Sequence, residues 1–495
     1  MPNNTVPTLS KTRFGAGLQC LKRLYLESFS RNLADTIDAT QQALFDSGNA
    51  VGELARQRFP GGRLIDEPYY DQPRAEATTL KAIADLEVPA FYEAAFSFEG
   101  IRVRADVLNR NSEDTFDLIE VKSSTSVKPQ HIPDAAIQLH VVEGSGVLIR
   151  KVFLLHIDNN YVYEGGSYDL SKLFHLEDIT DLARTYLASI PGSLADMWEA
   201  LNLDEAPSIE TGAQCIRPYK CSFYGYCHQD TPEHSIEQLP RAKPELIERL
   251  HSTGILDIRD IPLDFPKLSA NQQRVRDSVV TGQTYVGSGL QAALSQVEFP
   301  LCFLDFETFN PALPVYLGTR PYQLIPFQWS LHMLDSARNL SHASFLHNGD
   351  GDPRGSLSAS LLKAVGSEGT IVVYSSFEQT VIKRLYEEFP QYRDGLSAIS
   401  DRLFDLLAVV REHYYHPDFH GSYSIKSVLP ALVPDMTYSD LEIQDGSNAS
   451  VSFAQMIAPD TEESERERIR NALLDYCQMD TMAMVRLLDT LKGGL

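Results

Sequence analysis

The chain has 495 residues, 43% of them hydrophobic, and a formal net charge of −24. This length is sufficient for two or three domains with cores of their own. No apolar run reaches the roughly 20 residues of a membrane-spanning helix, and residues 1–5 do not begin a signal peptide, so we expect a soluble, cytoplasmic protein without a membrane partner.

Because phosphates are bound mainly through Lys and Arg, a strongly acidic chain can bind nucleic acid only where its basic residues are grouped locally. The sequence contains three such groups. They are Lys11, Arg13, Lys22 and Arg23; Arg102, Arg104 and Lys122; and Arg241 and Lys243.

Residues 101–108 and 116–122 alternate between apolar and polar side chains, and a turn rich in Asn, Ser, Glu and Asp joins them, which predicts a β-hairpin. Glu120 and Lys122 project from one face of their strand, and Asp106 on the neighbouring strand can reach that face. Two acids and a lysine are the set needed to bind one Mg²⁺ and to offset charge on a reacting phosphate. The alternative interpretation is a cross-strand ion pair.

The order Asp106, Glu120, Lys122, followed by a helix with Gln138, resembles the RecB-like PD-(D/E)XK nucleases. The resemblance implies catalytic roles for these four residues. It also implies that Glu53, ahead of residues 59–62, is the first acidic position of the family. The tyrosine that the family often places four residues after the glutamine is replaced by valine in this chain.

Four cysteines lie outside the apolar elements of the sequence: Cys20, then Cys215, Cys221 and Cys227 at intervals of six. A cysteine trio surrounded by aromatic residues suits a soft-metal thiolate site, with zinc as the alternative. One distant cysteine plus a trio resembles the iron–sulfur staple of AddB-type helicase–nucleases and of CRISPR-adaptation nucleases. The resemblance implies a [4Fe–4S] cluster with these four ligands, although the first gap of the trio is longer than is usual there.

The middle segment, residues 236–295, predicts short helices around 244–250 and 258–262. Its spacing of Leu, Gly, Ile and Pro resembles helix–hairpin–helix modules, which contact duplex backbones through amides. A plain helical linker is the other interpretation.

Residues 301–304 form an apolar run that leads into Asp305, Phe306 and Glu307. A buried strand here places both acids on one face, because strand side chains alternate. Two carboxylates forced together are unfavourable unless a cation pairs with them, and paired divalent ions are a common means of hydrolysing phosphodiesters.

Near the C-terminus, residues 463–491 show the apolar spacing of an amphipathic helix. Tyr476 and Asp480 are four residues apart and therefore share its core-facing stripe. A carboxylate on that stripe is costly unless it is neutralised. A simple Tyr–Asp hydrogen bond at the core edge is the alternative.

The strand acids followed by this Tyr–Asp pair resemble the DnaQ-like 3′–5′ exonucleases of the tyrosine type. The resemblance implies that Asp305, Glu307 and Asp480 hold two divalent metals, Mg²⁺ or Mn²⁺, and that Tyr476 orients the attacking water. The family requires one more carboxylate, for which we choose Glu378, after the strand expected at 370–374, with Asp405 as its rival. Two loop histidines, His416 and His420, are further candidates for substrate contact.

The whole chain resembles bacterial proteins that join a RecB-like iron–sulfur nuclease half to a DnaQ-like half. The expected fold is α/β: a PD-(D/E)XK core with an iron–sulfur staple at 1–235, a helical linker module at 236–295, and an RNase H-like exonuclease domain at 296–495. The expected function is metal-dependent hydrolysis of DNA in repair, recombination or defence, and the expected partners are nucleic acid and a helicase or a repair or defence protein.

Two alternatives to this function stay open. One is an RNA-processing exonuclease, because nothing in the sequence reads the 2′-hydroxyl. The other is a nucleic-acid-binding protein whose N-terminal nuclease domain is structural.

Overall fold

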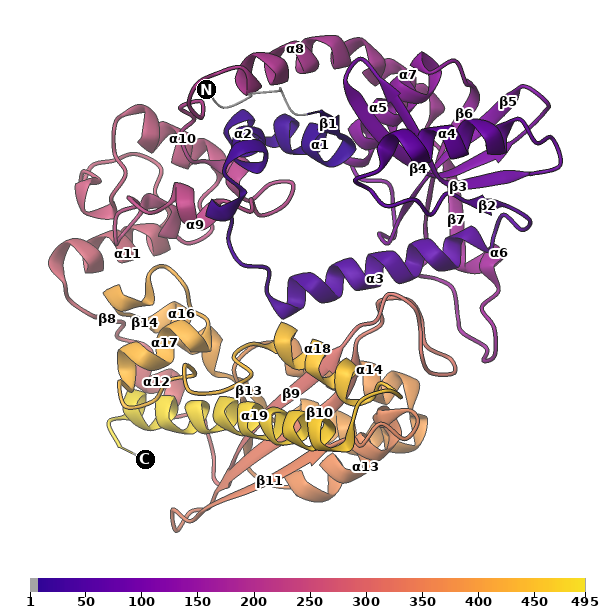
Figure 1. Cartoon of the computed structure of the whole chain (residues 1–495). Helices are drawn as coiled ribbons and strands as arrows, with labels where there is room; N and C mark the ends of the chain where they lie inside the picture. Colours follow the sequence, from indigo (N-terminus) through magenta and orange to yellow (C-terminus); the bar gives the residue numbers. More distant parts are fainter. Residues whose placement is uncertain (1–7, 495) are drawn as a thin grey trace. The chain divides into compact units, whose positions relative to one another are not determined.

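The structure is a computed structural model that describes residues 8–494, a mixed α/β protein with several sheets (Figure 1). It divides into two compact units. The first contains the chain up to Asp230 together with Pro311–Gln323, and the second contains Thr231–Asn310 and the chain from Leu324 onward. Residues 236–295, expected as a separate linker, lie within the second unit. Among the described residues, no helix is both long and apolar enough to cross a membrane.

The first unit is built on a mixed sheet whose strands run in the order β2-β3-β4-β5-β6-β7, with β1 beside β4. Its strands are β1 (Leu9–Ser10), β2 (Arg63–Leu64), β3 (Ala90–Phe98), β4 (Ile101–Arg110), β5 (Thr115–Lys122), β6 (Leu148–Ile157) and β7 (Phe174–Asp178). Its helices are α1 (Lys11–Gln19), α2 (Leu21–Phe29), α3 (Ala39–Arg56), α4 (Gln72–Ile83), α5 (His131–Gly144), α6 (Leu170–Leu173), α7 (Thr180–Tyr186), α8 (Ile190–Leu201) and α9 (Tyr224–Cys227). The antiparallel pairing of β4 with β5 confirms the predicted hairpin.

Different helices pack against the two faces of this sheet. On one face, Leu118 and Leu154 belong to a large core that includes buried residues of α1, α4, α5 and α8. On the other face, Ile119 and Leu155 pack with Val51 of α3. Because strand residues alternate between faces, Glu120 and Lys122 project to the α5 side.

Residues 311–323 complete the second face of this sheet, although they lie between two strands of the other unit. Ala312 is buried in the α3-side core, and Leu313 and Tyr322 pack against it. Hydrogen bonds fix the segment: Tyr163 N donates to Thr319 O at 2.9 Å, and Gly318 N donates to Tyr163 O at 2.7 Å. The first unit therefore needs a piece of chain from far downstream.

The second unit has a five-stranded sheet in the order β11-β10-β9-β12-β13, with β9 in the centre. Its strands are β8 (Tyr285–Val286), β9 (Leu301–Phe309), β10 (Ile325–Leu334), β11 (Leu340–Leu346), β12 (Thr370–Val373), β13 (Leu403–Asp405) and β14 (Tyr414–Tyr415). Its helices are α10 (Pro244–Ser252), α11 (Ala270–Thr281), α12 (Leu290–Leu294), α13 (Pro353–Val365), α14 (Phe377–Glu388), α15 (Arg393–Ser400), α16 (Leu406–His413), α17 (Ile425–Leu432), α18 (Gly446–Met456) and α19 (Glu463–Lys492). The structure confirms the predicted strand at 370–374 and the long C-terminal helix.

Strand β9 shows why the carboxylates face α19. Cys302, Leu304 and Phe306 belong to a core formed with α13, α14 and α15. The intervening residues Asp305 and Glu307 therefore project to the opposite face, where α18 and α19 pack against β9.

The middle segment is packed against the rest of the second unit. Asn271 of α11 accepts a hydrogen bond from the Tyr423 hydroxyl at 2.9 Å, and Arg274 donates to Glu412 O at 2.8 Å. Gly421 approaches the segment so closely that an added Cβ would lie 1.7 Å from Gln238 O. These contacts explain why residues 236–295 do not form a separate body.

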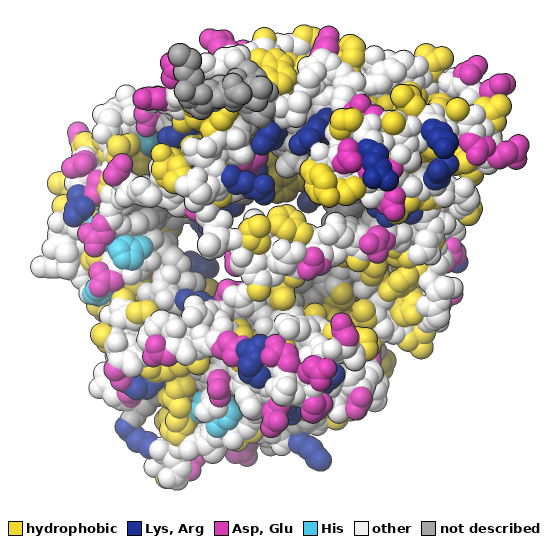
Figure 2. Space-filling view, viewed as in Figure 1, with side chains coloured by type: hydrophobic (Ala, Val, Ile, Leu, Met, Phe, Trp, Pro, Cys, Tyr) yellow, Lys and Arg dark blue, Asp and Glu magenta, His cyan; other side chains and the backbone are white. Residues whose placement is uncertain are grey.

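Figure 2 shows acidic side chains spread over the visible surface, with Lys and Arg in small groups, one of them over α1 and α2.

We predict that Gly421→Ala lowers the unfolding free energy of the second unit by roughly 3 kcal/mol, because the new methyl group meets backbone at a φ of 75°. The matched control is Gly282→Ala, at a φ of 66° with open space around the new Cβ, for which we expect a loss of about 1 kcal/mol. Chemical denaturation followed by circular dichroism measures both. Equal losses would contradict the close packing of the middle segment.

Candidate functional site

Four carboxylates from three elements of the second unit meet in one cavity of about 430 Å³. We call Asp305, Glu307, Glu378 and Asp480 the carboxylate cluster. Strand β9 supplies the first two, the first turn of α14 supplies Glu378, and α19 supplies Asp480. Three of the side chains are nearly buried, with exposed fractions of 5% for Glu307, 4% for Glu378 and 7% for Asp480, and Asp305 is partly buried.

The carboxylate cluster brings groups of like charge close together in a buried place. Burial raises the pKa of Asp305 well above its ordinary value, and the charges of Asp480 and Glu307 raise it further. Burial also raises the pKa of Glu307 well above its ordinary value. It raises the pKa of Glu378 to about 7 and that of Asp480 to about 6. Such a cluster is stable in its ionised form only if cations balance it.

Glu378, and not Asp405, completes the cluster. The Ser375 hydroxyl donates a hydrogen bond to Glu378 at 3.2 Å, and Glu378 is also hydrogen-bonded to Asp305. Asp405 instead ends β13 and caps α16, where its side chain accepts a hydrogen bond from Ala408 N at 3.2 Å. An oxygen engaged in a helix cap serves a structural purpose.

Tyr476 lies on α19 one turn before Asp480 and lines the same cavity. Its pKa is raised by burial and by the charges of Asp480 and Glu307, so its hydroxyl keeps its proton. A protonated phenol beside carboxylates can donate a hydrogen bond and orient a polar ligand.

The sequence interpretation missed two residues that hold this site together. Lys426 of α17 donates a hydrogen bond to the Tyr476 hydroxyl at 3.1 Å, and its charge lowers the pKa of Glu307 and Asp480. Its ammonium also lies 5.5 Å from the ring centre of Tyr438. Tyr438 donates a hydrogen bond of 2.6 Å to Asp480. No spacing rule singles out either residue, since Lys426 lies in the short helix α17 and Tyr438 lies outside any helix or strand.

Cys477, which the sequence presented only as a core residue, reaches the same cluster. Its sulfur lies 3.6 Å from an Asp305 oxygen, and ligand atoms of Asp305, Glu307 and Cys477 all lie within 4.8 Å of one another. Burial raises the pKa of this thiol well above its ordinary value, so it donates a weak hydrogen bond to the carboxylate.

The loop histidines lie elsewhere. The His420 ring stacks on that of His234 at a centroid distance of 5.4 Å, and the His416 imidazole lies 3.6 Å from an Asp418 oxygen. Neither histidine lines the cavity of the carboxylate cluster.

A second, larger cavity of about 1100 Å³ in the same unit is strongly basic. We call it the basic groove. Its cationic lining residues are Arg241, Lys243, Arg249, Lys267 and Arg411, beside one acid, Glu245. The middle segment supplies four of these cations. Residues 236–295, expected to be a linker, thus supply most of the positive charge of a surface large enough for a polyanion, although the chain as a whole is acidic.

The basic groove and the carboxylate cavity are joined through a few residues. Tyr374 lines the carboxylate cavity and donates a hydrogen bond of 3.2 Å to the backbone oxygen of Tyr423, which lines the groove. Ser424 lines the groove, and Ile425 and Lys426, which follow it directly, line the carboxylate cavity. The two cavities therefore have linings that adjoin along the chain at residues 423–426.

In the first unit, Glu120 is neutralised by the protein itself. Lys11 Nζ lies 2.9 Å and 3.1 Å from its two oxygens, and Lys122 Nζ lies 2.9 Å from one of them. Burial raises the pKa of Glu120, but the two ammonium groups lower it more, so its net pKa lies well below the ordinary value. Gln138, which is fully buried, donates a further hydrogen bond to Glu120.

The other predicted residues of this unit lie around a cavity of about 750 Å³. Asp106 and Glu53 both line it, and Asp106 accepts a hydrogen bond from Val121 N at 2.8 Å. Burial and the charge of Glu120 raise the pKa of Asp106 to about 7. Lys11 lies 4.0 Å from Asp106, so its ammonium occupies the space between the two acids. The residues fit a metal ion only after Lys11 has moved, and the sequence interpretation did not foresee this.

Cys20, Cys215, Cys221 and Cys227 line one small cavity of about 20 Å³ in the first unit. Two of the sulfurs accept backbone hydrogen bonds, Cys215 from Gly212 N at 3.5 Å and Cys221 from Phe223 N at 3.4 Å. Burial raises the pKa of Cys221 and of Cys227. The four cysteines do not belong to the described groups whose ligand atoms all lie within 4.8 Å of one another.

Residues 302–424 match a family described as a domain of unknown function, DUF2779. The match includes Asp305, Glu307 and Glu378 and ends before Tyr476 and Asp480. A search among curated proteins finds no relative that matches the chain.

We predict that the metal-free protein loses stability as the pH rises from about 4 to 8. The folded state has raised pKa values, about 7 at Glu378 and about 6 at Asp480, whereas unfolded carboxyls titrate near 4. At pH values between the unfolded and the folded pKa, the folded state retains protons that the unfolded chain has lost. The free energy of unfolding therefore falls as the pH rises. In a chelator, the midpoint temperature of thermal unfolding should fall by about 5 °C over this pH range, and the fall should be smaller in Glu378→Gln.

Added Mn²⁺ at pH 8 should restore the lost stability, because a ligand that binds only the folded state stabilises it. A pH dependence that is identical in Glu378→Gln and in the unchanged chain would contradict this account of the cluster.

Proposed function

We propose that this protein is a metal-dependent nuclease whose second unit removes nucleotides from the 3′ end of a DNA strand. The observation that carries the proposal is the carboxylate cluster: four converging carboxylates whose pKa values are raised by burial and, at Asp305 and Glu307, also by repulsion from the other acids. One nearby ammonium, that of Lys426, does not balance them.

The donor set fits hard divalent cations. Carboxylate oxygens are the ligands that Mg²⁺ and Mn²⁺ prefer, and Asp305, Glu307, Glu378 and Asp480 would hold them. Such ions, when bound, supply positive charge to a reacting phosphodiester and make water more acidic.

The chain's own residues position the reacting groups. Lys426 donates to the Tyr476 hydroxyl, so the phenolic proton is left for an acceptor in the cavity, such as Asp480. Because Tyr476 stays protonated, it can hold a water by donation. Tyr438 fixes one oxygen of Asp480, which limits the orientations of that carboxylate.

The basic groove supports a polymeric substrate. Five cations line a cavity of about 1100 Å³ whose lining adjoins that of the carboxylate cavity, and backbone phosphates are bound chiefly through such side chains. RNA is the second candidate, because phosphate contacts do not distinguish the two polymers.

For the first unit we propose a second hydrolytic site at Asp106, Glu120 and Lys122, with Glu53 and Gln138 beside it, and a [4Fe–4S] cluster on the four cysteines. The cavity beside Asp106 and the convergence of the four cysteines support these two proposals. The position of Lys11 favours the alternative in which this unit binds nucleic acid without cleaving it.

We predict that Asp305→Ala lowers 3′-end degradation of labelled DNA in Mn²⁺ by roughly a thousandfold or more, because it removes a charge from the cluster. Tyr476→Phe should slow degradation by roughly a hundredfold while metal binding persists, since it loses only the hydroxyl. Gel assays with single-stranded DNA and RNA measure both and identify the preferred polymer.

The matched control for these variants is Asp475→Asn, an exposed acid on the same helix, which should retain full activity. Undiminished degradation by Asp305→Ala would defeat the proposal. Cleavage that survives Asp305→Ala and disappears with Lys122→Ala would come from the first unit.

We predict that Lys243→Glu combined with Lys267→Glu weakens binding of a long single strand by about tenfold or more at low salt and flattens the salt dependence. Hydrolysis of a small phosphodiester, bis-p-nitrophenyl phosphate, should be unchanged. The matched control is the charge reversal of Lys383 and Arg384, both exposed on α14. Equal losses in the two double variants would contradict a specific strand path.

We predict that anaerobically purified protein is brown and contains about four iron atoms per chain if the four thiolates hold a cubane cluster. Cys221→Ser should remove the colour and destabilise the first unit, with little effect on 3′-end degradation by the second. A colourless protein with one zinc per chain would show that the same four cysteines bind zinc instead of iron.

A further inference from the structure

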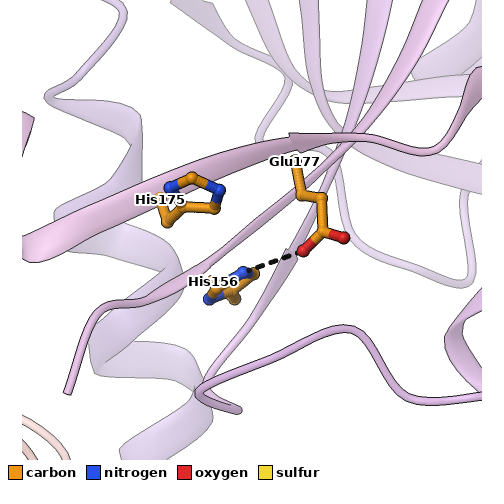
Figure 3. A group of neighbouring side chains, drawn as sticks. All are labelled: His156, His175 and Glu177. Atoms are coloured by element: carbon orange, nitrogen blue, oxygen red, sulfur yellow. Dashed lines mark hydrogen bonds and ion pairs between the residues drawn. The ribbon is translucent and has the colours of Figure 1, made fainter.

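The antiparallel strands β6 and β7 carry two histidines and a glutamate on one face (Figure 3). His156 and His175 are directly opposite each other across the two antiparallel strands, and Glu177 is two residues beyond His175. Opposed residues share a face, and so do residues two apart on a strand. The strand register itself therefore brings the three side chains together.

The ligand atoms of these three residues all lie within 4.8 Å of one another. The two imidazole rings have a centroid separation of 5.2 Å, and His156 Nε2 lies 3.4 Å from a Glu177 oxygen. Figure 3 shows the three side chains turned toward a common point from the two strands. His156 is buried, whereas His175 and Glu177 are exposed, the Glu177 side chain by 47%, so the point is open to solvent on the β7 side.

The hydrogen bonds of His156 leave its second nitrogen facing a carboxylate. Its Nδ1 lies 3.1 Å from the backbone oxygen of Ile157, and because a carbonyl only accepts, Nδ1 carries a proton. In a neutral imidazole, Nε2 then presents its lone pair to Glu177, which also only accepts. A shared cation would satisfy both groups, and a backbone carbonyl on the other nitrogen is the usual support of a metal-binding histidine.

We infer that His156, His175 and Glu177 form a binding site for a borderline divalent cation such as Zn²⁺. Two imidazoles and one carboxylate suit Zn²⁺, Co²⁺ or Ni²⁺ and suit Mg²⁺ poorly. Three protein ligands leave one tetrahedral position for water. This site is distinct from the carboxylate cluster and from the cysteines, and it does not rest on the proposed nuclease activity.

A cation at this position would join the two strands. β7 is the last strand in the sheet order, with five residues, and its register is set against β6 alone among the strands of that sheet that the structure describes. A metal held by His156 on β6 and by His175 and Glu177 on β7 would therefore fasten the edge strand.

The test is zinc binding by the full chain after removal of metals with a chelator. Isothermal titration and elemental analysis should show one Zn²⁺ fewer per chain in His175→Ala than in the unchanged protein. Glu177→Gln should weaken the same binding event by at least about tenfold. His175 is exposed, so its replacement should leave the fold intact, which circular dichroism checks.

The matched control is His140→Ala. His140 lies 3.2 Å from Glu99, a histidine–glutamate pair of the same unit that is not part of a three-ligand group among the described residues. Its replacement should leave zinc stoichiometry unchanged.

A second readout identifies the ligands directly. Pulsed electron paramagnetic resonance of the protein with half an equivalent of Cu²⁺ should show nitrogen modulation from two imidazoles, reduced in His175→Ala. Carboxylate or thiolate ligation gives no imidazole signal. The same zinc content in the unchanged chain and in His175→Ala, or the absence of imidazole modulation, would overturn the inference and leave an ordinary histidine–glutamate ion pair.

Discussion

Repulsion among the buried carboxylates is the constraint around which the second unit is organised. Asp305 and Glu307 alternate on β9 with Leu304 and Phe306, so the strand that gathers the negative charge is also anchored in the core. Helix α19 has the same double role, since Leu473 and Leu487 are fully buried beside Asp480. The apolar packing holds together charges that would otherwise separate, and replacing one of them should stabilise the fold while removing its chemistry.

The two units treat buried acid in opposite ways. In the first, Lys11 and Lys122 neutralise Glu120 inside the protein, and its pKa is lowered. In the second, the acids outnumber the nearby cation, and their pKa values are raised. In the first arrangement Glu120 is balanced without a ligand, although the pKa of Asp106 beside it is raised, whereas the second is satisfied by protons at low pH or by added cations at neutral pH. This difference is the physical reason for placing the main proposed activity in the second unit.

The sequence predicted those features that depend on local periodicity. The β4–β5 hairpin, strand β12 and helix α19 follow from the alternation and spacing of apolar residues, and the pairing of Asp305 with Glu307 follows from alternation on β9. Tyr438 and Lys426 could not be predicted in this way, because their contacts with Asp480 and Tyr476 depend on how loops and short helices pack over the sheet.

The position of Lys11 also could not be predicted from the sequence, because Lys11 lies 109 residues from Glu120, the glutamate that it binds. The same holds for the middle segment. Its short helices were predicted, but their attachment to the second unit depends on backbone contacts such as that between Gly421 and Gln238.

Residues 311–323 determine when the first unit can finish folding during synthesis of the chain. They fill part of the α3-side core of the first unit through Ala312, Leu313 and Tyr322, yet they follow β9, the central strand of the second unit. During translation the first unit therefore cannot close this core when residue 230 leaves the ribosome, and must wait for nearly a hundred further residues. Throughout that interval the α3 side of its sheet exposes apolar surface, which is the condition under which nascent chains engage chaperones.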